Sequence, residues 1–334
     1  MSQGSTRSSG PVSVGVDLGG TNVRAVVFDA DMRVLGREET FTRAEEGADR
    51  VISRMADCVR AALEWAGLGL AGTSGVGVGA AGLTDWRSGT VLLASNLGWR
   101  DVPLADALSR HLEGTRVSVD KDTNVAALAE ARLGAGRSFD HFLYVTAGTG
   151  IGGGLVLNGA LYRGATGGAG DIGHVVVDPD GPSCGCGDHG CVEVFASGGG
   201  IVNRTEEALA RGGPEAEASV LEAEGLTAEV VFRAAQEGDD LAAGVVRQAG
   251  EMLGLALADY VNLNNPEAIV LGGGLLRAGE LYRAPVEREM KRRSLPALGD
   301  VVRLVAPELA EDVGPIGAAL LLAEPRPERD GGGT

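Results

Sequence analysis

The feature that most constrains the fold is a pattern that occurs twice: an apolar run, a turn rich in glycine and threonine, and a second apolar run. The first copy covers residues 12–29 around a turn at 19–21, and the second covers residues 142–157 around a turn at 148–150. Short apolar runs on either side of such a turn are typical of strand hairpins. The repetition indicates an internal duplication and predicts two α/β halves of related topology.

Both turns offer the chemistry that a polyphosphate needs. Backbone N–H groups and a threonine hydroxyl can donate hydrogen bonds, and the missing glycine side chains let a phosphate approach closely. Asp17 ends the first apolar run, where a carboxylate can hold Mg²⁺ together with phosphate oxygens. A single turn of this kind usually only joins strands, and Asp17 can also serve as a turn cap. The pair of turns predicts a nucleotide in a cleft between the two halves.

A second constraint is a group of one histidine and three of the four cysteines in a short segment of the second half. The candidate ligands are His174, Cys184, Cys186 and Cys191. Such a set fills the tetrahedral shell of structural Zn²⁺ and leaves no position for a catalytic water. Disulfides are disfavoured, because the polar residues 1–10 do not form a signal segment. Cys58 lies in an amphipathic helical pattern and is expected in a core.

Composition sets the outer limits. A chain of 334 residues predicts two domains, and a formal net charge of −17 disfavours nucleic-acid or anionic-membrane partners. No apolar run approaches the roughly 20 residues needed to span a bilayer, so we expect a soluble cytoplasmic protein. The polar ends, residues 1–10 and 326–334, are expected to be disordered tails.

Residues 117–128 predict a strand that runs directly into a helix, with Asp122 at the junction. A carboxylate there can take the proton from a hydroxyl group that attacks a γ-phosphate, which is the role that phosphoryl transfer commonly gives to an Asp. Alternatively, Asp122 only caps the helix, since Asp is a favoured cap. Further helices are predicted over residues 47–66, 227–235, 239–261 and 311–320.

From about residue 13 to 322 the chain resembles the ROK family of sugar kinases, of the bacterial glucokinase type, within the actin-like ATPase superfamily. The motifs that carry the resemblance are residues 17–21, 79–85, 96–99, 122–124, 148–150, the histidine and cysteine segment, and residues 265–274. The resemblance implies an α/β, duplicated actin-like ATPase (ribonuclease H-like) fold. Two domains would surround a nucleotide and sugar cleft, with a structural zinc. The implied small N-terminal domain comprises residues 11–118 plus 312–325, and the large C-terminal domain comprises residues 119–311.

The resemblance also implies an activity and its residues. ATP, with Mg²⁺, would phosphorylate the exocyclic hydroxymethyl group (6-OH) of glucose or a close analogue, with Asp122 as the general base. The implied substrate-binding residues are Gly82, Asn96, Lys121, Asp122, Asp171, His174 and Glu193. The implied nucleotide-binding residues are Asp17, Gly19, Gly20, Thr21, Asn22, Thr146, Gly148, Thr149, Gly150, Gly272, Gly273 and Gly274. His189 is expected to be a solvated turn residue, and a homodimer or homotetramer is expected.

Two positions depart from the glucokinase pattern, and both concern the sugar. Lys121 stands where the family typically has Asn, and Asp171 stands where it typically has Glu. Lysine only donates hydrogen bonds, whereas Asn also accepts them, and Asp is one methylene shorter than Glu. One hypothesis is local drift, with Lys121 paired to Asp120 or Asp171 and glucose still accepted. The other is an analogue such as kanosamine or a C7-cyclitol, phosphorylated in antibiotic biosynthesis.

Three further alternatives stay open. The phosphoryl donor could be polyphosphate instead of ATP. The family also contains sugar-responsive repressors, although the first strand begins near residue 12, which leaves no room for a winged helix before it. A non-catalytic sugar-binding protein is disfavoured because Asp17 and Asp122 are both present.

Overall fold

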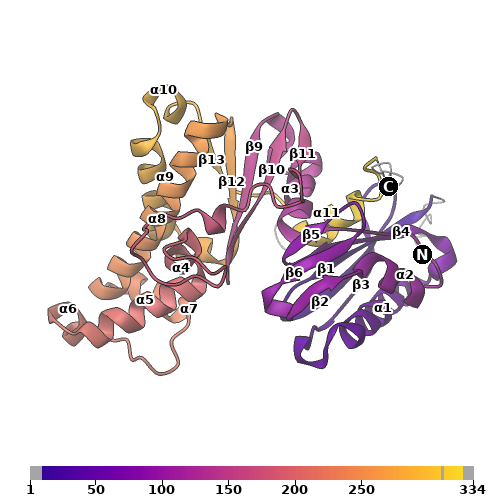
Figure 1. Ribbon diagram of the computed structural model, residues 1–334, viewed down its shortest axis with the longest axis horizontal. Coiled ribbons are helices and arrows are strands. Elements are labelled where there is room, and N and C mark those ends of the chain that lie inside the picture. Colours follow the sequence, from indigo (N-terminus) through magenta and orange to yellow (C-terminus); the bar gives the residue numbers. More distant parts are fainter. Residues whose placement is uncertain (1–9, 310–311, 326–334) are drawn as a thin grey trace, which may run out of the picture. The chain divides into compact units, whose positions relative to one another are not determined.

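The computed structural model describes residues 10–309 and 312–325, and the chain divides into two compact units (Figure 1). Of these residues, unit 1 contains those up to 137, then 160–169, and those from 308 onward; unit 2 contains 138–159 and 170–307. The domain boundary expected at residue 118 differs from this division, because residues 119–137 and 160–169 lie in unit 1. The expected disordered tails lie outside the described residues, except for Gly10.

Unit 1 is built on a mixed five-stranded sheet with the order β3-β2-β1-β4-β8. Its strands are β1 (Val12–Leu18), β2 (Asn22–Phe28), β3 (Val34–Phe41), β4 (Thr73–Ala80) and β8 (Val117–Lys121). β1 pairs with β2 in an antiparallel hairpin, as predicted, and with β4 in parallel. A small antiparallel sheet adds β5 (Leu83–Asp85), β6 (Thr90–Ala94) and β7 (Trp99–Val102).

The alternation of side chains along β2 shows that both faces of this sheet are covered. Val23 and Val27 belong to the core cluster that contains α1 (Ala48–Trp65) and α2 (Leu104–His111). Val26 and Phe28 point the other way and pack with Ala319 of α11 (Val313–Leu320). Since successive strand residues point to opposite faces, the sheet is buried on both sides.

The backbone of α11 lies directly on the sheet because glycines face it. A methyl group on Gly77 would lie 1.7 Å from the Ala318 carbonyl oxygen, and one on Gly15 would lie 1.8 Å from that of Pro315. α11 also packs against α3 (Asp122–Leu133), which follows β8. These contacts explain why residues 119–137 belong to unit 1 and not to the second half of the chain.

α1 confirms the helix predicted over residues 47–66, and Cys58 on it is only 3% exposed. Its Sγ lies 3.5 Å from the Glu38 carbonyl oxygen. Burial raises the pKa of the Cys58 thiol to about 12. Cys58 is therefore a small core residue, as expected.

Unit 2 repeats the topology of unit 1. Its sheet has the order β11-β10-β9-β12-β13, with β9 and β10 antiparallel and β12 parallel to both β9 and β13. The strands are β9 (Phe142–Ala147), β10 (Ile151–Leu157), β11 (Ala160–Tyr162), β12 (Ala268–Gly272) and β13 (Arg303–Val305). The same positions in the two sheets hold the two glycine and threonine turns, as the predicted duplication requires.

The helices of unit 2 surround one long, apolar helix, α8 (Asp240–Asn264). By length and composition α8 could cross a membrane. The expectation that no apolar run approaches the length needed to span a bilayer was therefore wrong for this helix. However, 61% of its apolar window is buried inside the protein, so it is the central core helix of unit 2. The other helices are α4 (Val192–Ala196), α5 (Gly198–Arg211), α6 (Pro214–Ala218), α7 (Ala228–Gln236), α9 (Glu280–Arg293) and α10 (Pro296–Gly299).

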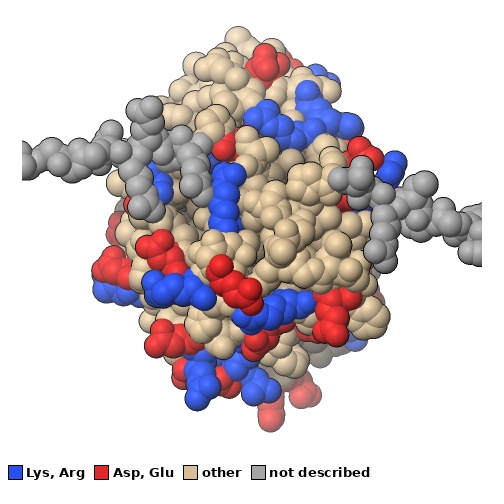
Figure 2. Space-filling view, turned by 90° about the vertical axis from the view of Figure 1, so that its right-hand side faces the viewer, with Lys and Arg blue, Asp and Glu red and all other residues tan. Residues whose placement is uncertain are grey.

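The surface carries charges of both signs despite the net charge of −17. On the face shown in Figure 2, basic and acidic side chains lie interspersed. The face shown in Figure 2 therefore presents no broad field of one sign. Ion pairs occur in both units, as between Arg54 and Glu46 in unit 1 and between Arg288 and Glu251 in unit 2.

Candidate active site

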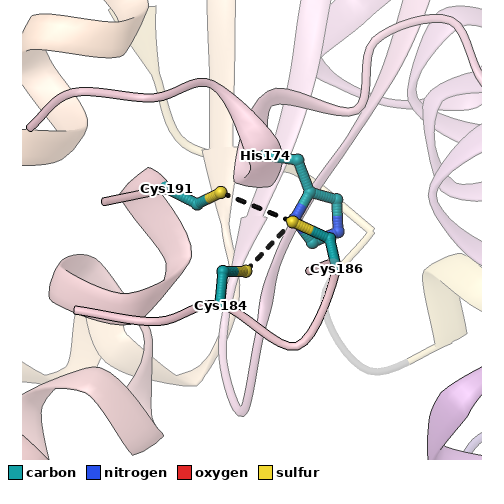
Figure 3. Close-up of side chains that lie close together, drawn as sticks. All are labelled: His174, Cys184, Cys186 and Cys191. Atoms are coloured by element: carbon teal, nitrogen blue, oxygen red, sulfur yellow. Dashed lines mark hydrogen bonds between the residues drawn. The ribbon is translucent and has the colours of Figure 1, made fainter. Parts of the chain in front are cut away.

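The four predicted metal ligands form one cluster in unit 2 (Figure 3). Their ligand atoms all lie within 4.8 Å of one another; the Sγ atoms of Cys186 and Cys191 are 3.6 Å apart, and Cys184 Sγ is 3.7 Å from His174 Nδ1. A tetrahedral zinc with Zn–S bonds of about 2.3 Å requires ligand separations of about 3.8 Å. The residues therefore fit a closed Cys₃His zinc site.

Tight backbone turns hold this cluster together. The Cys184 N–H donates to the Asp188 carbonyl oxygen over 2.7 Å, and the Val192 N–H donates to that of Val175 over 2.9 Å. His189 lies on the exposed side of the loop and is not part of the cluster, as predicted. The metal ligands are thus brought together by the loop itself and not by distant packing.

The second phosphate turn lines a cavity of about 740 Å³ within unit 2, a typical volume for a small-molecule site. Its wall combines apolar side chains with polar groups. The lining residues are Gly148, Thr149, Gly198, Gly199, Val202, Asn203, Leu226, Thr227, Ala228, Glu229, Phe232, Arg233, Gln236, Gly274, Leu275 and Arg277. Three predicted nucleotide residues, Gly148, Thr149 and Gly274, are thus brought to one cavity. Thr146 is the second-last residue of β9, Gly150 completes the turn, and Gly272 and Gly273 precede Gly274, but none of these four lines the cavity.

Sequence analysis missed the start of α5 as part of this cavity. Ser197 caps this helix by accepting a hydrogen bond from the Gly200 N–H, and the Gly198 N–H donates to the Gly148 carbonyl oxygen over 2.8 Å. A helix N-terminus favours anions because its first N–H groups have no partner within the helix. A serine followed by three glycines before a helical pattern was the available signal.

The first phosphate turn lies in unit 1, between β1 and β2. The Gly19 N–H donates to the Asn22 carbonyl oxygen, and Thr42 Oγ1 donates to the Gly19 carbonyl oxygen over 2.7 Å. A methyl group on Gly20 would lie 3.1 Å from Nδ2 of Asn96, a predicted sugar ligand. Thr21 is exposed. The Asn22 amide donates to Glu39, so it is engaged by the protein itself.

Asp17 stands at the end of β1 in an environment that disfavours its charge. Burial raises the pKa of its carboxyl group, and the Arg24 guanidinium only partly opposes this effect. Gly314 of α11 lies against it, since a methyl group there would be 3.0 Å from Asp17 Cγ. A half-buried carboxylate whose charge is disfavoured in this way fits a bound cation, which would compensate its charge.

The predicted junction of strand and helix is present where β8 ends at Lys121 and α3 begins at Asp122. The Asp122 carboxylate accepts a hydrogen bond of 2.7 Å from the Thr123 N–H. Lys121, at the cap position, makes no side-chain cap, and it is only 5% exposed. Asp122 therefore lies in the first turn of α3, with its backbone held by two regular elements.

The remaining predicted sugar residues are divided between the units. Gly82 in unit 1 has a positive φ of 101° and packs on β6, where a methyl group would lie 2.3 Å from the Leu93 carbonyl oxygen. Asp171 and His174 are exposed residues of unit 2. Glu193, also in unit 2, accepts a hydrogen bond of 2.9 Å from the Ile151 N–H. Each unit therefore carries its own set of these residues.

The two sheets of the same strand order, each with a glycine and threonine turn after its first strand, define an α/β two-domain kinase fold of the actin-like ATPase type. A family model described as the ROK family matches residues 13–324, so the chain belongs to the ROK family. This confirms the resemblance found in the sequence.

The individual relatives include enzymes and a regulator. A glucokinase of Halalkalibacterium halodurans is 36% identical over 313 residues, which cover 93% of this chain and 94% of the relative. The crystal structure of a ROK family glucokinase from Streptomyces griseus in complex with glucose and AMPPNP is 34% identical, with a TM-score of 0.79 over 93% of this chain and 98% of that one. A ROK family transcriptional regulator, a homologue of the E. coli MLC protein, is 27% identical, with a TM-score of 0.82 over 95% of this chain and 79% of that one.

Proposed function

We propose that this protein is a sugar kinase that transfers the γ-phosphoryl group of ATP to the exocyclic 6-hydroxyl group of glucose or of a close glucose analogue. The observation that carries the proposal is the position of Asp122 at the β8–α3 junction, in a chain that matches glucokinases along almost its whole length. The glucose and AMPPNP bound to the Streptomyces griseus relative support a sugar acceptor and an adenine nucleotide donor.

Each group at the site has a separate task in this proposal. Asp122 takes the proton from the attacking hydroxyl group, which makes the oxygen a better nucleophile. The phosphates would lie against the turn around Thr149 and the start of α5, with the N–H groups of Thr149 and Gly199 as the donors, because those of Gly198 and Gly200 already donate within the protein. Asp17 would hold Mg²⁺ together with phosphate oxygens, and the cation supplies neutralisation of the charge that develops on the leaving group. The Cys₃His cluster, when it holds zinc, fixes the loop that carries His174.

The role of Asp122 is tested by measuring ADP release with glucose for Asp122→Asn and Asp122→Ala. We expect turnover to fall by roughly 10²–10⁴-fold, the usual contribution of a general base, while ATP binding stays within about twofold of the unchanged protein. Asp259→Asn is the matched control, since Asp259 is an exposed carboxylate of α8 in unit 2, whereas Asp122 lies in unit 1. Full turnover in Asp122→Ala would overturn the mechanism.

A specific observation favours a glucose analogue as the alternative acceptor. Lys121 is the residue directly before the proposed base Asp122, and it is almost completely buried, so a side chain that can only donate hydrogen bonds is shielded from solvent at this position. Kanosamine or a C7-cyclitol, phosphorylated on the equivalent hydroxymethyl group (7-OH in the cyclitol), would present different groups to Lys121 and Asp171 than glucose does. Such a kinase would serve specialised metabolism, such as antibiotic biosynthesis.

The acceptor is decided by comparing kcat/KM for glucose, mannose, N-acetylglucosamine, kanosamine and a C7-cyclitol under identical conditions. If kcat/KM is highest for glucose, Lys121 and Asp171 are neutral substitutions in a glucokinase. If an analogue is preferred by about 100-fold, a transition-state difference of nearly 3 kcal/mol, these residues determine specificity. Replacing ATP with polyphosphate in the same assay identifies the donor.

The proposal includes a cytoplasmic homodimer or homotetramer that does not bind nucleic acid. A ROK family regulator shares this fold, so a regulatory role is the competing proposal. Light scattering measures the oligomeric state. Turnover of any sugar that depends on Asp122 would favour the enzyme.

A further inference from the structure

We propose that Asp120 and Arg163 form an ion pair that positions the catalytic base Asp122, so that Arg163, though far along the chain from the base, controls the rate of phosphoryl transfer. This inference rests on the proposed role of Asp122. It concerns positioning residues and assigns neither of them contact with substrate.

Asp120 holds residues on both sides of the base Asp122: the backbone of Lys121 before it and the side chain of Asn124 after it. It is completely buried, and its Oδ1 accepts hydrogen bonds of 2.8 Å from the Lys121 N–H and of 2.8 Å from Asn124 Nδ2. Lys121 comes immediately before Asp122, and Asn124 comes two residues after it. Because one carboxylate oxygen fixes both neighbours, a movement of Asp120 would be transmitted to Asp122.

Arg163 holds the other oxygen of Asp120. Its Nε lies 2.6 Å from Asp120 Oδ2, and its side chain is only 11% exposed. The guanidinium group also stacks over the Trp86 ring, 4.4 Å from the ring centroid, with Arg87 4.8 Å from the same centroid. Trp86 therefore fixes the plane of the guanidinium group, which then has a defined direction toward Asp120.

The charge balance explains why Arg163 controls the position of Asp120. A fully buried carboxylate is costly without a partner, and removal of one member of a buried ion pair leaves an uncompensated charge. Without Arg163, the Asp120 carboxylate would lose the charged partner of its Oδ2 and would turn toward water, which would weaken its hold on Lys121 and Asn124. Displacement of a catalytic group by about 1 Å can cost on the order of 100-fold in rate.

A nearby cavity makes the inference testable by chemical rescue. Trp86, Arg87, Ser118, Asp120 and Arg163 all line a cavity of about 480 Å³ in unit 1. A free guanidinium ion that enters this cavity can occupy the place of the missing group in an Arg163→Ala variant. Arg87→Ala is the matched control, because Arg87 lines the same cavity and stacks on the same ring, but its guanidinium group donates to the Ala165 carbonyl oxygen and its backbone N–H to Asp85.

The experiment measures kcat, the KM for ATP and the KM for the sugar. The proteins compared are the wild-type protein, Arg163→Ala, Asp120→Asn and Arg87→Ala. We expect kcat to fall roughly 10- to 100-fold in the first two variants, with the KM for ATP within about twofold, and to be nearly unchanged in Arg87→Ala. Roughly 20 mM guanidinium chloride, far below denaturing concentrations, should raise the kcat of Arg163→Ala at least about fivefold. It should not raise the kcat of the other variants. Sodium chloride at equal ionic strength should restore none.

Circular dichroism and thermal unfolding identify variants that fail to fold. If Arg163→Ala does not fold, Arg163→Lys replaces it, because lysine keeps the charge but cannot reproduce the guanidinium plane; a lowered kcat with unchanged KM for ATP then supports the inference. A folded Arg163 variant with unchanged kcat overturns it, as does an equal loss in Arg87→Ala, or a loss that guanidinium does not relieve. Failure of the proposed function is distinguishable, because Asp122→Asn would then keep its turnover.

Discussion

The carboxylate of Glu193 accepts a hydrogen bond of 2.9 Å from the backbone N–H of Ile151, the residue that follows the second phosphate turn. Glu193 lies two residues after the metal ligand Cys191, and α4 begins between them. At the other end of α4, the Gly198 N–H donates to the Gly148 carbonyl oxygen. The turn at residues 148–150 is therefore joined to both ends of α4, the short helix that follows the candidate metal ligands, whereas the sequence predicted only a sugar contact for Glu193.

The first prediction concerns removal of the metal. Cys186→Ser, or exhaustive dialysis against a chelator, should lower the Tm and weaken ATP binding by about tenfold, because the segment that carries Glu193 and its hydrogen bond to Ile151 would lose its anchor. Metal content, Tm and the Kd for ATP are the measurements. His189→Ala, in the same loop but outside the cluster, should keep its zinc and its affinity. A folded, metal-free protein with unchanged ATP affinity would show that the hydrogen bonds of Glu193 to Ile151 and of Gly198 to Gly148 do not transmit the loss of the metal.

The second prediction concerns Asp17 and stability. Burial raises its pKa in the folded protein, so the folded state binds the proton more tightly than the unfolded state does. The stabilisation from this proton is complete below the unfolded pKa and is lost as pH rises through the folded pKa. Asp17→Asn should therefore raise the Tm at neutral pH in the absence of cations and lose turnover.

The pH dependence provides the check on Asp17. The difference in Tm between Asp17→Asn and the unchanged protein should shrink as the pH is lowered through the range in which Asp17 becomes protonated. Thermal unfolding measured from about pH 7 down to pH 4, around the usual carboxyl pKa values, tests this. A difference that grows as the pH falls would contradict the prediction.

The third prediction tests the contact between α11 and the sheet of unit 1. Gly77→Ala should destabilise the protein by roughly 2–4 kcal/mol, because the new methyl group would lie 1.7 Å from the Ala318 carbonyl oxygen and the helix would have to move. Gly69→Ala, in the same unit with no atom within 4 Å of the new methyl group, should change the stability by less than about 0.5 kcal/mol. Denaturant unfolding followed by circular dichroism compares the two.

The fourth prediction concerns the reactivity of Cys58. The thiolate is the reactive form of cysteine, and burial raises the pKa of Cys58 to about 12. Iodoacetamide at about pH 8 should therefore leave Cys58 unmodified in the folded protein and alkylate it after unfolding, since an ordinary thiol pKa is near 8.5. Peptide mass spectrometry measures the modification. Rapid alkylation of Cys58 in the folded protein would show that α1 opens readily.

The sequence alone predicted those features of the site that depend on local spacing. The ligands from His174 to Cys191 come together through tight turns of one loop, and Asp122 lies where an apolar strand meets a helical pattern. Neither placement needs contacts between distant segments. The two hairpins were predictable for the same reason, because alternation and turn residues act over a few positions.

Only the tertiary structure decided which distant segments share a surface. The α5 start at Gly198, the α7 side chain of Phe232 and the Gly274 turn line one cavity, although no local pattern connects them. The ion pair between Asp120 and Arg163 and the placement of residues 119–137 with α11 have the same origin. Such contacts form because helices and sheets bury their apolar faces against one another, and the energy of that packing depends on the whole arrangement and not on any short stretch of sequence.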